Sequence, residues 1–494
     1  MRLAQALETI DVQELVGTTD REITGIAYDS RQVVPGDLFV AMRGTRADGH
    51  DFIRDAIGRG AAAVITERMT QRFSDTPVVL VADARTALAH LSAHFFSDPS
   101  RGMTLIGVTG TNGKTTTSFL IESMLKEDGQ KTGVIGTVNY RFADQVLPAP
   151  TTTPQSYEIQ RLLRDMEKQG IVSVVMEVSS HALDQSRVAG CHFNVGVFTN
   201  LSPEHLDYHG DMHSYFAAKK RFFTEILQKS AKESRAVLNA DDPWLEDLTR
   251  NLPTSSTITF GLERGTIRAV SHTFSLEGIN AVIETPAGPL SVASRLIGEY
   301  NLYNVMAAVG VGIALGLSLD TMQRGVSALS RVPGRMERVG IGKPTVLVDY
   351  AHTPDALEQS LRALRHLVEG RLLVVFGCGG DRDRTKRPRM GRIAVKWADK
   401  AIITSDNPRT ENPLAIIDDI TAGLVDTPTE RYVIVADRRE AIDMALTLAA
   451  PSDVVLIAGK GHEDYQIIGT HRHHFDDREE IQRVLTAGIE GARK

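Results

Sequence analysis

Short apolar runs alternate with helical patterns along most of the chain, which is the order of elements in an α/β fold. In the central part, the runs at 105–108, 172–176 and 195–198 are mostly apolar on consecutive positions. Such runs predict parallel strands that are buried on both faces of a sheet. We therefore expect a parallel sheet covered by helices in the middle of the chain.

The first 98 residues carry a smaller α/β pattern of their own. Strands are predicted at 37–41, 62–65 and 78–81, and a helix is predicted at 52–58. A turn rich in Ser, Asp and Pro at 97–100 separates this unit from the central one.

After the central strands the pattern changes twice. Residues 268–292 lack helical periodicity and predict a β-rich insertion, whereas 300–315 predicts a buried helix. Beyond a hinge at 333–335, five apolar runs separated by helical stretches indicate a doubly wound sheet. These runs lie at 345–349, 372–376, 401–404, 432–435 and 454–458. At about 100–200 residues per domain, we expect three domains, at 1–98, 99–333 and 334–494.

A glycine turn between a predicted strand and a predicted helix carries the clearest chemistry in the chain. It runs Gly110-Thr111-Asn112-Gly113-Lys114-Thr115-Thr116. Backbone N–H groups of such a turn close around phosphate oxygens. Lys114 can neutralise the phosphates, and the Thr115 hydroxyl can hold Mg²⁺. We expect ATP or GTP to bind here. Val108 stands where the usual pattern has its first glycine, and this variant loop favours a particular kind of ATP-dependent protein.

Two loops that follow later strands add groups able to surround a metal ion. Glu177 directly follows a predicted strand, where a carboxylate can bind Mg²⁺ or polarise a metal-bound water. The loop at 200–210 holds five titratable side chains between Glu204 and His209. An imidazole with carboxylates and a threonine hydroxyl favours magnesium or manganese over zinc, because most of these ligands are hard oxygens.

Three turns follow predicted strands of the last unit, where a doubly wound sheet binds its ligands. Residues 377–383 form a second glycine-rich turn, which permits close backbone approach to a ligand. Residues 406–409 and 459–463 combine charge with a tight turn. The histidines at 471–474 could suggest metal, but a solvated strand end explains them better. The basic run at 217–221, early in a predicted helix, has a solvated face as its plain interpretation.

Composition fits a globular enzyme. Of 494 residues, 42% are hydrophobic and 24% charged, and the net charge of −7 argues against a general nucleic-acid binder. The two cysteines, Cys191 and Cys378, have no metal-type spacing and indicate no disulfide framework. No leader-type apolar segment opens the chain, and no run reaches the roughly 20 apolar residues of a membrane span. We therefore expect a cytoplasmic protein that binds no nucleic acid and spans no membrane.

Together these motifs resemble the Mur ligase family of ATP-dependent amide-forming enzymes, and within it the ligases that add diaminopimelate. The resemblance covers essentially the whole chain. Besides the motifs above, it rests on Tyr28–Arg31, Pro35–Phe39, Thr151–Pro154, Glu177–His181, Tyr300–Asn304, Gly334–Glu337 and Asp349–Ala356. It implies an α/β architecture of three domains: one for a UDP-sugar, a central P-loop-type ATPase sheet, and a C-terminal Rossmann-like doubly wound sheet for the amino acid.

The resemblance also implies roles for individual residues. Lys219 would be carboxylated by CO₂, whereas Lys220 does not align with that lysine. The magnesium shell would comprise Thr115, Glu177, His205 and the carbamate, and Lys114 would complete the catalytic set. ATP would be framed by the phosphate loop together with Asn301, Arg335 and Asp349.

The implied substrates are UDP-N-acetylmuramoyl-L-alanyl-D-glutamate and meso-2,6-diaminopimelate, and the implied process is peptidoglycan precursor synthesis. We expect the protein to act as a monomer. The uridine nucleotide would meet Ser30, Thr45, Arg46 and Ala47. The muramoyl peptide would meet Thr151, Thr152, Thr153, Ser179, Gln185 and Arg187. Diaminopimelate would be held by Arg382, Asp406, Asn407, Pro408, Arg409, Gly459 and Glu463. A buried, fork-shaped Arg409 guanidinium would recognise its second carboxylate.

The chemistry agrees with these residues. A carboxylate resists amines because its charge repels nucleophiles and oxide is a poor leaving group. Transfer of the ATP γ-phosphoryl makes an acyl phosphate, which the amine attacks with loss of phosphate, so catalysis is mainly positioning and charge neutralisation. Three alternatives stay open: a folylpolyglutamate synthetase-like ligase, the same muramoyl ligase adding L-lysine, and a P-loop switch without ligase activity. The N-terminal unit and the 406–409 motif argue against the first.

Overall fold

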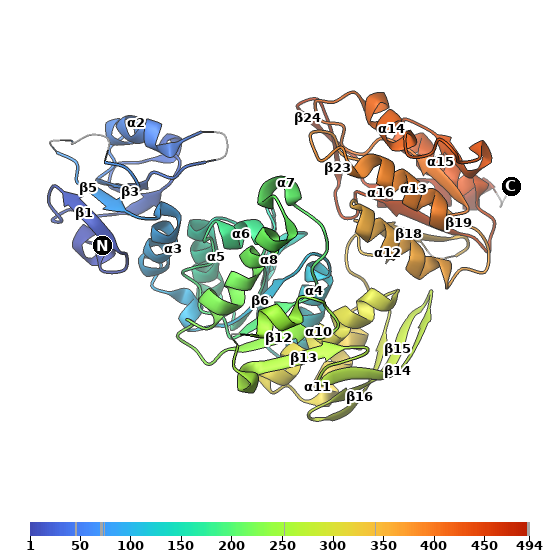
Figure 1. Cartoon of the computed structure of the whole chain (residues 1–494), viewed down its shortest axis with the longest axis horizontal. Coiled ribbons are helices and arrows are strands. Elements are labelled where there is room, and N and C mark those ends of the chain that lie inside the picture. The colour runs from blue at the N-terminus through green and yellow to red at the C-terminus, as the bar shows by residue number, and fades with distance from the viewer. Residues whose placement is uncertain (45–46, 70–72, 74, 251, 341, 492–494) are drawn as a thin grey trace.

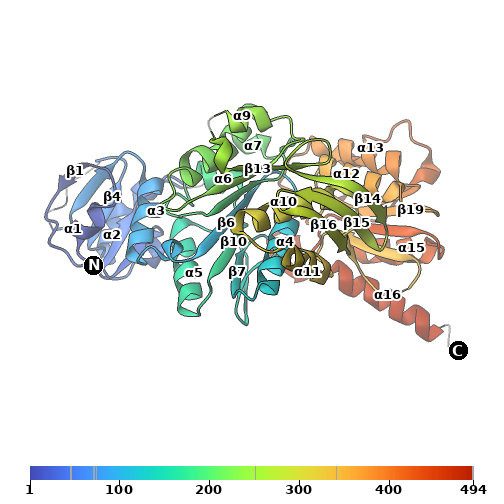
Figure 2. The same ribbon diagram turned by 90° about the horizontal axis from the view of Figure 1, so that it is seen from below.

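The computed structural model describes residues 1–44, 47–69, 73, 75–250, 252–340 and 342–491. Its main sheets lie in three lobes that follow one another along the long axis in chain order (Figure 1, Figure 2). The predicted α/β class is therefore confirmed. The domain boundaries after residues 98 and 333 stay predictions.

The N-terminal sheet has five strands in the order β1-β5-β4-β3-β2. They are β1 (Val12–Val16), β2 (Gly25–Ala27), β3 (Asp37–Val40), β4 (Ala63–Thr66) and β5 (Val78–Val81). Alternate strand residues pack on α1 (Leu3–Leu7) and α3 (Ala84–Phe95) on one face, and on α2 (Ile53–Gly58) on the other. Helix α3 also packs against α5 (Ser156–Lys168) of the central lobe.

The central sheet has eleven strands in the order β16-β15-β14-β13-β12-β11-β6-β10-β7-β8-β9. Its parallel core comprises β6 (Thr104–Thr109), β7 (Thr132–Ile135), β10 (Ser173–Glu177), β11 (Val195–Phe198), β12 (Arg235–Asn239) and β13 (Thr257–Gly261). Antiparallel pairing extends one edge through β8 (Asn139–Phe142) and β9 (Gln145–Pro148). At the other edge β14 (Ile267–Ser275) pairs parallel to β13, and β15 (Gly278–Thr285) and β16 (Gly288–Ser294) follow by antiparallel pairing. The β-rich segment is thus confirmed, but it continues the sheet rather than forming a separate insertion.

Helices cover both faces of the central sheet. On one face lie α4 (Lys114–Glu127), α10 (Glu299–Leu315) and α11 (Leu319–Ala328). On the other lie α5, α6 (Ser180–Asp184) and α8 (Met212–Arg221). The predicted buried helix at 300–315 is α10. Lys219 falls in the last turn of α8, before a π-helical turn at Phe222–Leu227, so placing it early in a helix was wrong.

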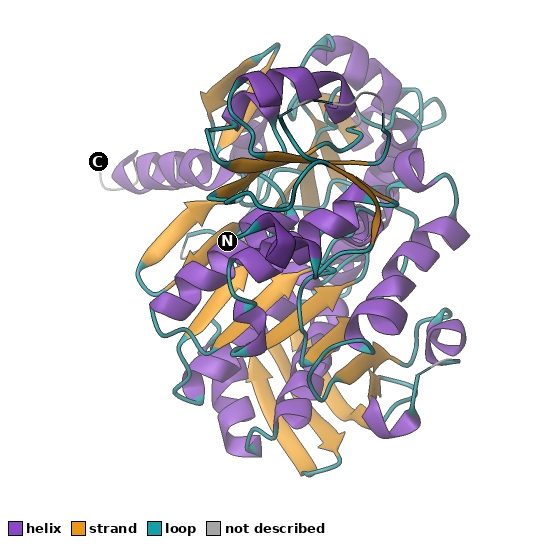
Figure 3. Ribbon diagram, turned by 90° about the vertical axis from the view of Figure 1, so that its left-hand side faces the viewer, coloured by secondary structure: helices purple, strands orange, loops and turns teal. Residues whose placement is uncertain are grey.

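The C-terminal sheet has six strands in the order β17-β18-β22-β19-β20-β21. They are β17 (Glu337–Arg338), β18 (Thr345–Asp349), β19 (Leu372–Phe376), β20 (Lys400–Ile403), β21 (Tyr432–Ile434) and β22 (Val454–Ala458). One face packs on α12 (Pro354–Arg365), α13 (Lys386–Trp397) and α14 (Pro413–Thr421), and the other on α15 (Arg438–Leu448) and α16 (Asp477–Gly491). The predicted doubly wound sheet is confirmed, and Figure 3 shows helices layered against the strands throughout the molecule.

A hairpin of β23 (Tyr465–Ile468) and β24 (His471–His474) follows β22. All four residues of β24 are exposed, as expected of a solvated strand end. In the described part of the chain, no helix is long and apolar enough to cross a membrane.

Candidate active site

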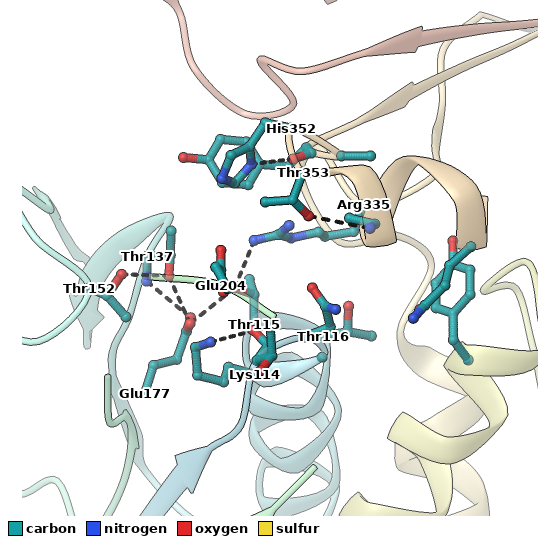
Figure 4. Close-up of a pocket in the computed structure, with 18 of the residues that line it drawn as sticks. Lys114, Thr115, Thr116, Thr137, Thr152, Glu177, Glu204, Arg335, His352 and Thr353 are labelled. Carbon is teal, nitrogen blue, oxygen red and sulfur yellow. Dashed lines mark hydrogen bonds between the residues drawn. The ribbon is translucent and has the colours of Figure 1, made fainter. Parts of the chain in front are cut away.

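Strand ends of two sheets meet around one cavity of about 240 Å³ (Figure 4). The central lobe contributes the loops after β6, β7, β10 and β11, and the C-terminal lobe contributes the loop after β18. Because both sheets present carboxyl ends of parallel strands, each offers the edge at which α/β sheets bind ligands.

Two glycines with positive φ shape the turn between β6 and α4. At Gly110 (φ +145°) a Cβ would lie 1.9 Å from Thr199 Oγ1, and at Gly113 (φ +87°) it would lie 2.3 Å from Asn304 Oδ1. No side chain caps α4, which begins at Lys114, so its first backbone N–H groups remain available to an anion. The turn therefore has the local geometry of a phosphate site.

Lys114 folds back over this turn. Its Nζ donates to the backbone oxygens of Gly110 at 2.8 Å and Thr111 at 2.7 Å. Burial lowers the pKa of Lys114, while the carboxylates of Glu204 and Glu177 act in the opposite sense. The ammonium group lies where it can neutralise a bound phosphate.

Glu177 ends β10, the strand beside β6, and accepts hydrogen bonds from two threonines. Thr115 Oγ1 donates to it at 3.1 Å, and Thr137 donates through its hydroxyl at 2.8 Å and its N–H at 3.0 Å. Arg335 Nη2, from the C-terminal lobe, donates to Thr115 Oγ1 at 3.2 Å. The structure thus brings the predicted residues Thr115, Glu177 and Arg335 together (Figure 4).

Lys219 lies against the same turn and is only 1% exposed. Its Nζ donates to the Gly110 oxygen at 2.9 Å and lies 4.6 Å from the centre of the Tyr215 ring. Burial, reinforced by the Lys114 charge, holds the pKa of Lys219 well below that of an ordinary lysine. The environment therefore favours the uncharged amine, which is the nucleophilic form.

The loop after β11 brings Glu204 and His205 to the cavity. His205 has φ +56°, which is uncommon for a non-glycine residue, and its side chain is 43% exposed. Burial acts to raise the pKa of Glu204, but the charges of His205 and Lys114 outweigh it and hold that pKa below its usual value. The structure thus adds Glu204 to the candidate site, as a carboxylate whose pKa is held low by His205 and Lys114.

Asp349 and Arg335 form the C-terminal wall of the cavity. Asp349 ends β18, and its oxygens accept from the backbone N–H groups of Met336 at 2.7 Å and Ala351 at 3.0 Å. Burial raises the pKa of Asp349, against the effect of the Arg335 charge. The Arg335 guanidinium lies 4.8 Å from the centre of the Tyr350 ring. Asp349 therefore fixes the turn that aims Arg335 at the phosphate loop.

Asn301 lies behind the cavity rather than in its lining. It is 1% exposed, its Nδ2 donates to the Ile297 oxygen at 2.8 Å, and its Oδ1 accepts from Asn304 Nδ2 at 2.9 Å. Asn304, which does line the cavity, lies against Gly113 of the phosphate loop and accepts from Thr117 Oγ1 at 3.3 Å. The sequence reasoning missed Asn304, although one motif holds both asparagines.

The residues predicted for an amino acid gather at the carboxyl ends of β20 and β22. Asn407 Nδ2 donates to Glu463 Oε2 at 2.9 Å, and a Cβ on Gly459 (φ +113°) would lie 2.6 Å from Asp406 Oδ2. Burial and the Asp406 charge raise the pKa of Glu463. Lys460, which the sequence reasoning left out of the site, is fully buried with its Nζ 3.5 Å from Glu463 Oε2.

Arg409 and Arg382 lie at the rim of this cluster. Arg409 has φ +52° and is half-buried, whereas a buried guanidinium was expected. Its Nη1 donates to the Gly380 oxygen at 2.7 Å, and a Cβ on Gly379 would lie 2.9 Å from the same nitrogen. Arg382 is exposed, and Pro408 is buried under Gly380. The glycine-rich turn at 377–383 thus lies close to Arg409, a side chain of the same protein.

The residues predicted for a muramoyl peptide lie beside Glu177. Thr153 Oγ1 donates to the Glu177 backbone oxygen at 2.8 Å, and the N–H of Ser179 donates to Thr153 Oγ1 at 3.0 Å. Arg187 donates to the Thr153 oxygen and to Gln185 Oε1, both at 2.7 Å. Thr151 Oγ1 donates to that same Thr153 oxygen at 3.1 Å, and Thr152 and Ser179 also line the cavity.

The residues predicted for a uridine nucleotide belong to the N-terminal lobe, and those that the structure describes do not line the cavity. Ser30 opens a 3₁₀ turn, Ser30–Gln32, and Ala47 is exposed. Thr45 and Arg46 lie outside the described residues. Close to Ser30, the Tyr28 hydroxyl donates to Glu158 Oε1 of α5 at 2.9 Å, which links the two lobes.

Comparisons with known proteins agree with this arrangement. The Mur ligase family catalytic domain model matches residues 22–96, the Mur ligase middle domain model matches 108–312, and the Mur ligase glutamate ligase domain model matches 334–461. The chain belongs to the Mur ligase family.

Individual relatives match over nearly their whole length. The UDP-N-acetylmuramoyl-L-alanyl-D-glutamate–2,6-diaminopimelate ligase of Geobacter metallireducens is 48% identical, covering 97% of this chain and 98% of the relative. The ligase of the same name from Gloeobacter violaceus is 49% identical, with 94% of each chain covered. A solved structure of such a ligase aligns with a TM-score of 0.72 and 34% identity over 99% of both chains.

Proposed function

We propose that this protein is an ATP-dependent ligase that adds meso-2,6-diaminopimelate to UDP-N-acetylmuramoyl-L-alanyl-D-glutamate in peptidoglycan precursor synthesis. The observation that carries the proposal is the cavity where the phosphate loop faces Lys219, Glu177 and the C-terminal wall. Relatives named for this reaction, at 48% and 49% identity over nearly the whole chain, support it.

The first step activates the D-glutamate side-chain carboxylate. One of its oxygens attacks the γ-phosphorus of ATP, the bond from phosphorus to the bridging oxygen breaks, and ADP leaves. Charge collects on the phosphoryl oxygens in this step, and pre-positioned cations stabilise it. Lys114 and Arg335, which approach the loop from two lobes, supply that charge.

The second step forms the amide. The amine of diaminopimelate attacks the acyl carbon, the tetrahedral intermediate expels phosphate with the electron pair of the C–O bond, and the nitrogen loses its extra proton. No covalent bond to the protein forms, so positioning and exclusion of water dominate catalysis. The cavity between two sheets suits this, because it brings an activated acid to the lobe that carries the amino-acid residues.

The nucleoside of ATP would occupy a second cavity of about 650 Å³ that adjoins the first. The two cavities share Asn112, Gly113, Tyr300, Asn304 and Gln359 in their linings. A nucleotide can therefore extend from one into the other past the phosphate loop. The second cavity also includes Asn239 and Tyr303, whose polar atoms could contact a base.

Magnesium and a carbamate on Lys219 belong to the proposal, and the oxygens of Thr115 and Glu177 and the buried Lys219 amine support it. Among the residues with described coordinates, no three His, Cys, Asp or Glu side chains are grouped to hold a metal ion. Thr115 and Glu177 offer oxygens, and a carbamate would add an anionic oxygen beside the Lys114 cation. When bound, magnesium would neutralise charge on the transferring phosphoryl group. His205 would lie at the edge of this shell.

Diaminopimelate would bind where Asp406, Asn407 and Glu463 gather, with the two carboxylates near its distal ammonium. Arg409 would pair with the distal carboxylate from the rim, which separates diaminopimelate from L-lysine. UDP-N-acetylmuramate would run from Ser30 in the N-terminal lobe past Arg187 to Thr152 and Ser179. We also propose a cytoplasmic monomer divided at residues 98 and 333. The family models that match residues 22–96, 108–312 and 334–461 support these divisions.

Phosphate release from ATP tests this function. We expect release only when the muramoyl dipeptide and an amino acid are both present, with diaminopimelate best among a panel of amino acids. Release without either substrate would indicate a nucleotide switch. Release with a folate and glutamate in place of the muramoyl dipeptide would indicate the folyl-type ligase.

A further inference from the structure

One carboxylate of the C-terminal lobe holds the phosphate loop of the central lobe. Asp355 lies in the first turn of α12, and its Oδ2 accepts from Asn112 Nδ2 at 2.9 Å and from Ser202 Oγ at 2.9 Å. Gln359, one turn further along α12, donates to the same oxygen at 3.0 Å. Three hydrogen bonds converge on this oxygen, and two of them cross between the lobes.

The central side of this contact is itself braced. The N–H of Asn112 donates to Asn200 Oδ1 at 2.9 Å, and its backbone oxygen accepts from Thr199 Oγ1 at 2.6 Å. The N–H of Ser202 donates to Thr111 Oγ1 at 3.0 Å. Asp355 therefore bonds to the phosphate loop and to the loop after β11, at the point where hydrogen bonds already join these two loops.

The C-terminal side leads directly to the candidate amino-acid site. Helix α12 follows β18 after four residues, and β18 pairs with β22. The N–H of Gly459 donates to the Asp349 oxygen at 3.0 Å, and Gly459 backs on Asp406. A displacement of α12 relative to the phosphate loop would therefore move the strand ends that carry Asp406 and Glu463.

We propose that Asp355 is a positioning residue that couples occupancy of the phosphate loop to binding of the amino acid. This inference rests on the proposed function. A nucleotide that orders the turn around Asn112 favours the lobe orientation in which Asp355 is bonded, and that orientation presents the amino-acid site. By thermodynamic linkage, nucleotide and amino acid then raise each other's affinity by the same factor.

Calorimetry with and without a non-hydrolysable ATP analogue and Mg²⁺ measures that factor for diaminopimelate. In the wild type we expect the analogue to raise the affinity by about 5-fold or more. Asp355→Ala should bring the factor close to one while each ligand alone binds as before. Asp355→Asn keeps an oxygen acceptor and should retain part of the factor. A merely structural role would weaken both ligands separately instead.

Glu358→Ala is the matched control, because Glu358 lies on α12 but bonds to Lys396 and Trp397 inside the C-terminal lobe. It should keep the wild-type factor. If Asp355→Ala does not fold, Ser202→Ala removes one donor from the central side and should lower the factor. A ligating wild type without coupling, or full coupling in both Asp355→Asn and Ser202→Ala, would overturn the proposal. A wild type that does not ligate contradicts the proposed function instead.

Discussion

The chain uses a glycine followed by lysine at the end of a buried parallel strand twice, with opposite results. Gly113-Lys114 comes after β6, and Gly459-Lys460 comes after β22. Both glycines have positive φ, +87° and +113°, and each is pressed against a polar side chain of another element. The two turns are locally alike, yet one is suited to an anion and the other to an ammonium group.

The difference arises from the element that the chain enters after each turn. After Lys114 the chain enters α4, so the first helix N–H groups and the Lys114 ammonium, which donates to the Gly110 and Thr111 oxygens, lie at the same cavity. After Lys460 the chain enters the β23–β24 hairpin, and the buried lysine pairs with Glu463 and with the backbone oxygen of Tyr465. The second cation is thus paired within the chain, and under the proposed function Asp406 and Glu463 would be the groups that face the ligand. Of these two Gly-Lys turns, the one at which a helix begins has the local geometry of a phosphate site.

If the second turn serves an amino acid with two charged ends, the largest effect should be on substrate choice. We expect the wild type to prefer meso-diaminopimelate to L-lysine by about 10⁴-fold in kcat/KM, because lysine leaves Arg409 without its carboxylate partner. Arg409→Ala should lose most of this preference, and Arg409→Lys should keep part of it. If the wild type used L-lysine equally well, the proposal that this turn binds diaminopimelate would be contradicted.

Lys219 should have the next largest effect, since it shares the Gly110 oxygen with Lys114. Lys219→Ala should lower kcat by about 10³-fold, as expected for loss of a group that stabilises transition-state charge. A short carboxylic acid should restore part of the rate if the working form is a carbamate. Lys220→Ala is the matched control and should stay near wild-type activity. Unchanged activity of Lys219→Ala, or a plain lysine in the mass of the active protein, contradicts the carbamate.

Lys114→Ala removes the cation of the first turn. The rate should fall by about 10²–10³-fold, because phosphate charge is left uncompensated, while the thermal unfolding temperature stays close to that of the wild type. Lys126→Ala, which removes a surface ion pair with Glu122 on the same helix, should leave the rate unchanged. Near-normal turnover of a folded Lys114→Ala protein would show that the turn is not a phosphate site.

Substitution of two glycines in the C-terminal lobe tests the second turn further, and the expected effect on KM is smaller. Gly459→Ala places a Cβ 2.6 Å from Asp406 Oδ2, so we expect KM for diaminopimelate to rise about tenfold, the effect of roughly 1.4 kcal/mol. Gly469 also has positive φ, +60°, but a Cβ there meets nothing within 4 Å. Gly469→Ala therefore controls for backbone strain alone. Equal KM values in the two variants would mean that Asp406 does not bind the amino acid.

Local pattern was sufficient for the elements and for the first turn. Uninterrupted apolar runs predicted the parallel strands of both sheets, because buried strands need apolar side chains on both faces. The strand–glycine–lysine–helix order predicted the phosphate loop, since its glycines, lysine and threonines all come from one short segment. The family resemblance added partners of this loop from distant segments, and the structure brings Thr115, Glu177 and Arg335 into contact.

The sequence by itself determined the fold class, the phosphate loop and the strand ends at which ligands should lie. Only the tertiary structure decided which side chains share a cavity. Asn304 rather than Asn301 lies against Gly113 of the phosphate loop, Lys460 pairs with Glu463, and Asp355 bonds to Asn112 of the other lobe. Arg409 is half-buried rather than buried. These outcomes depend on how the lobes pack and on which of several polar partners, far apart in the chain, form hydrogen bonds. Neither produces a periodic pattern in the sequence.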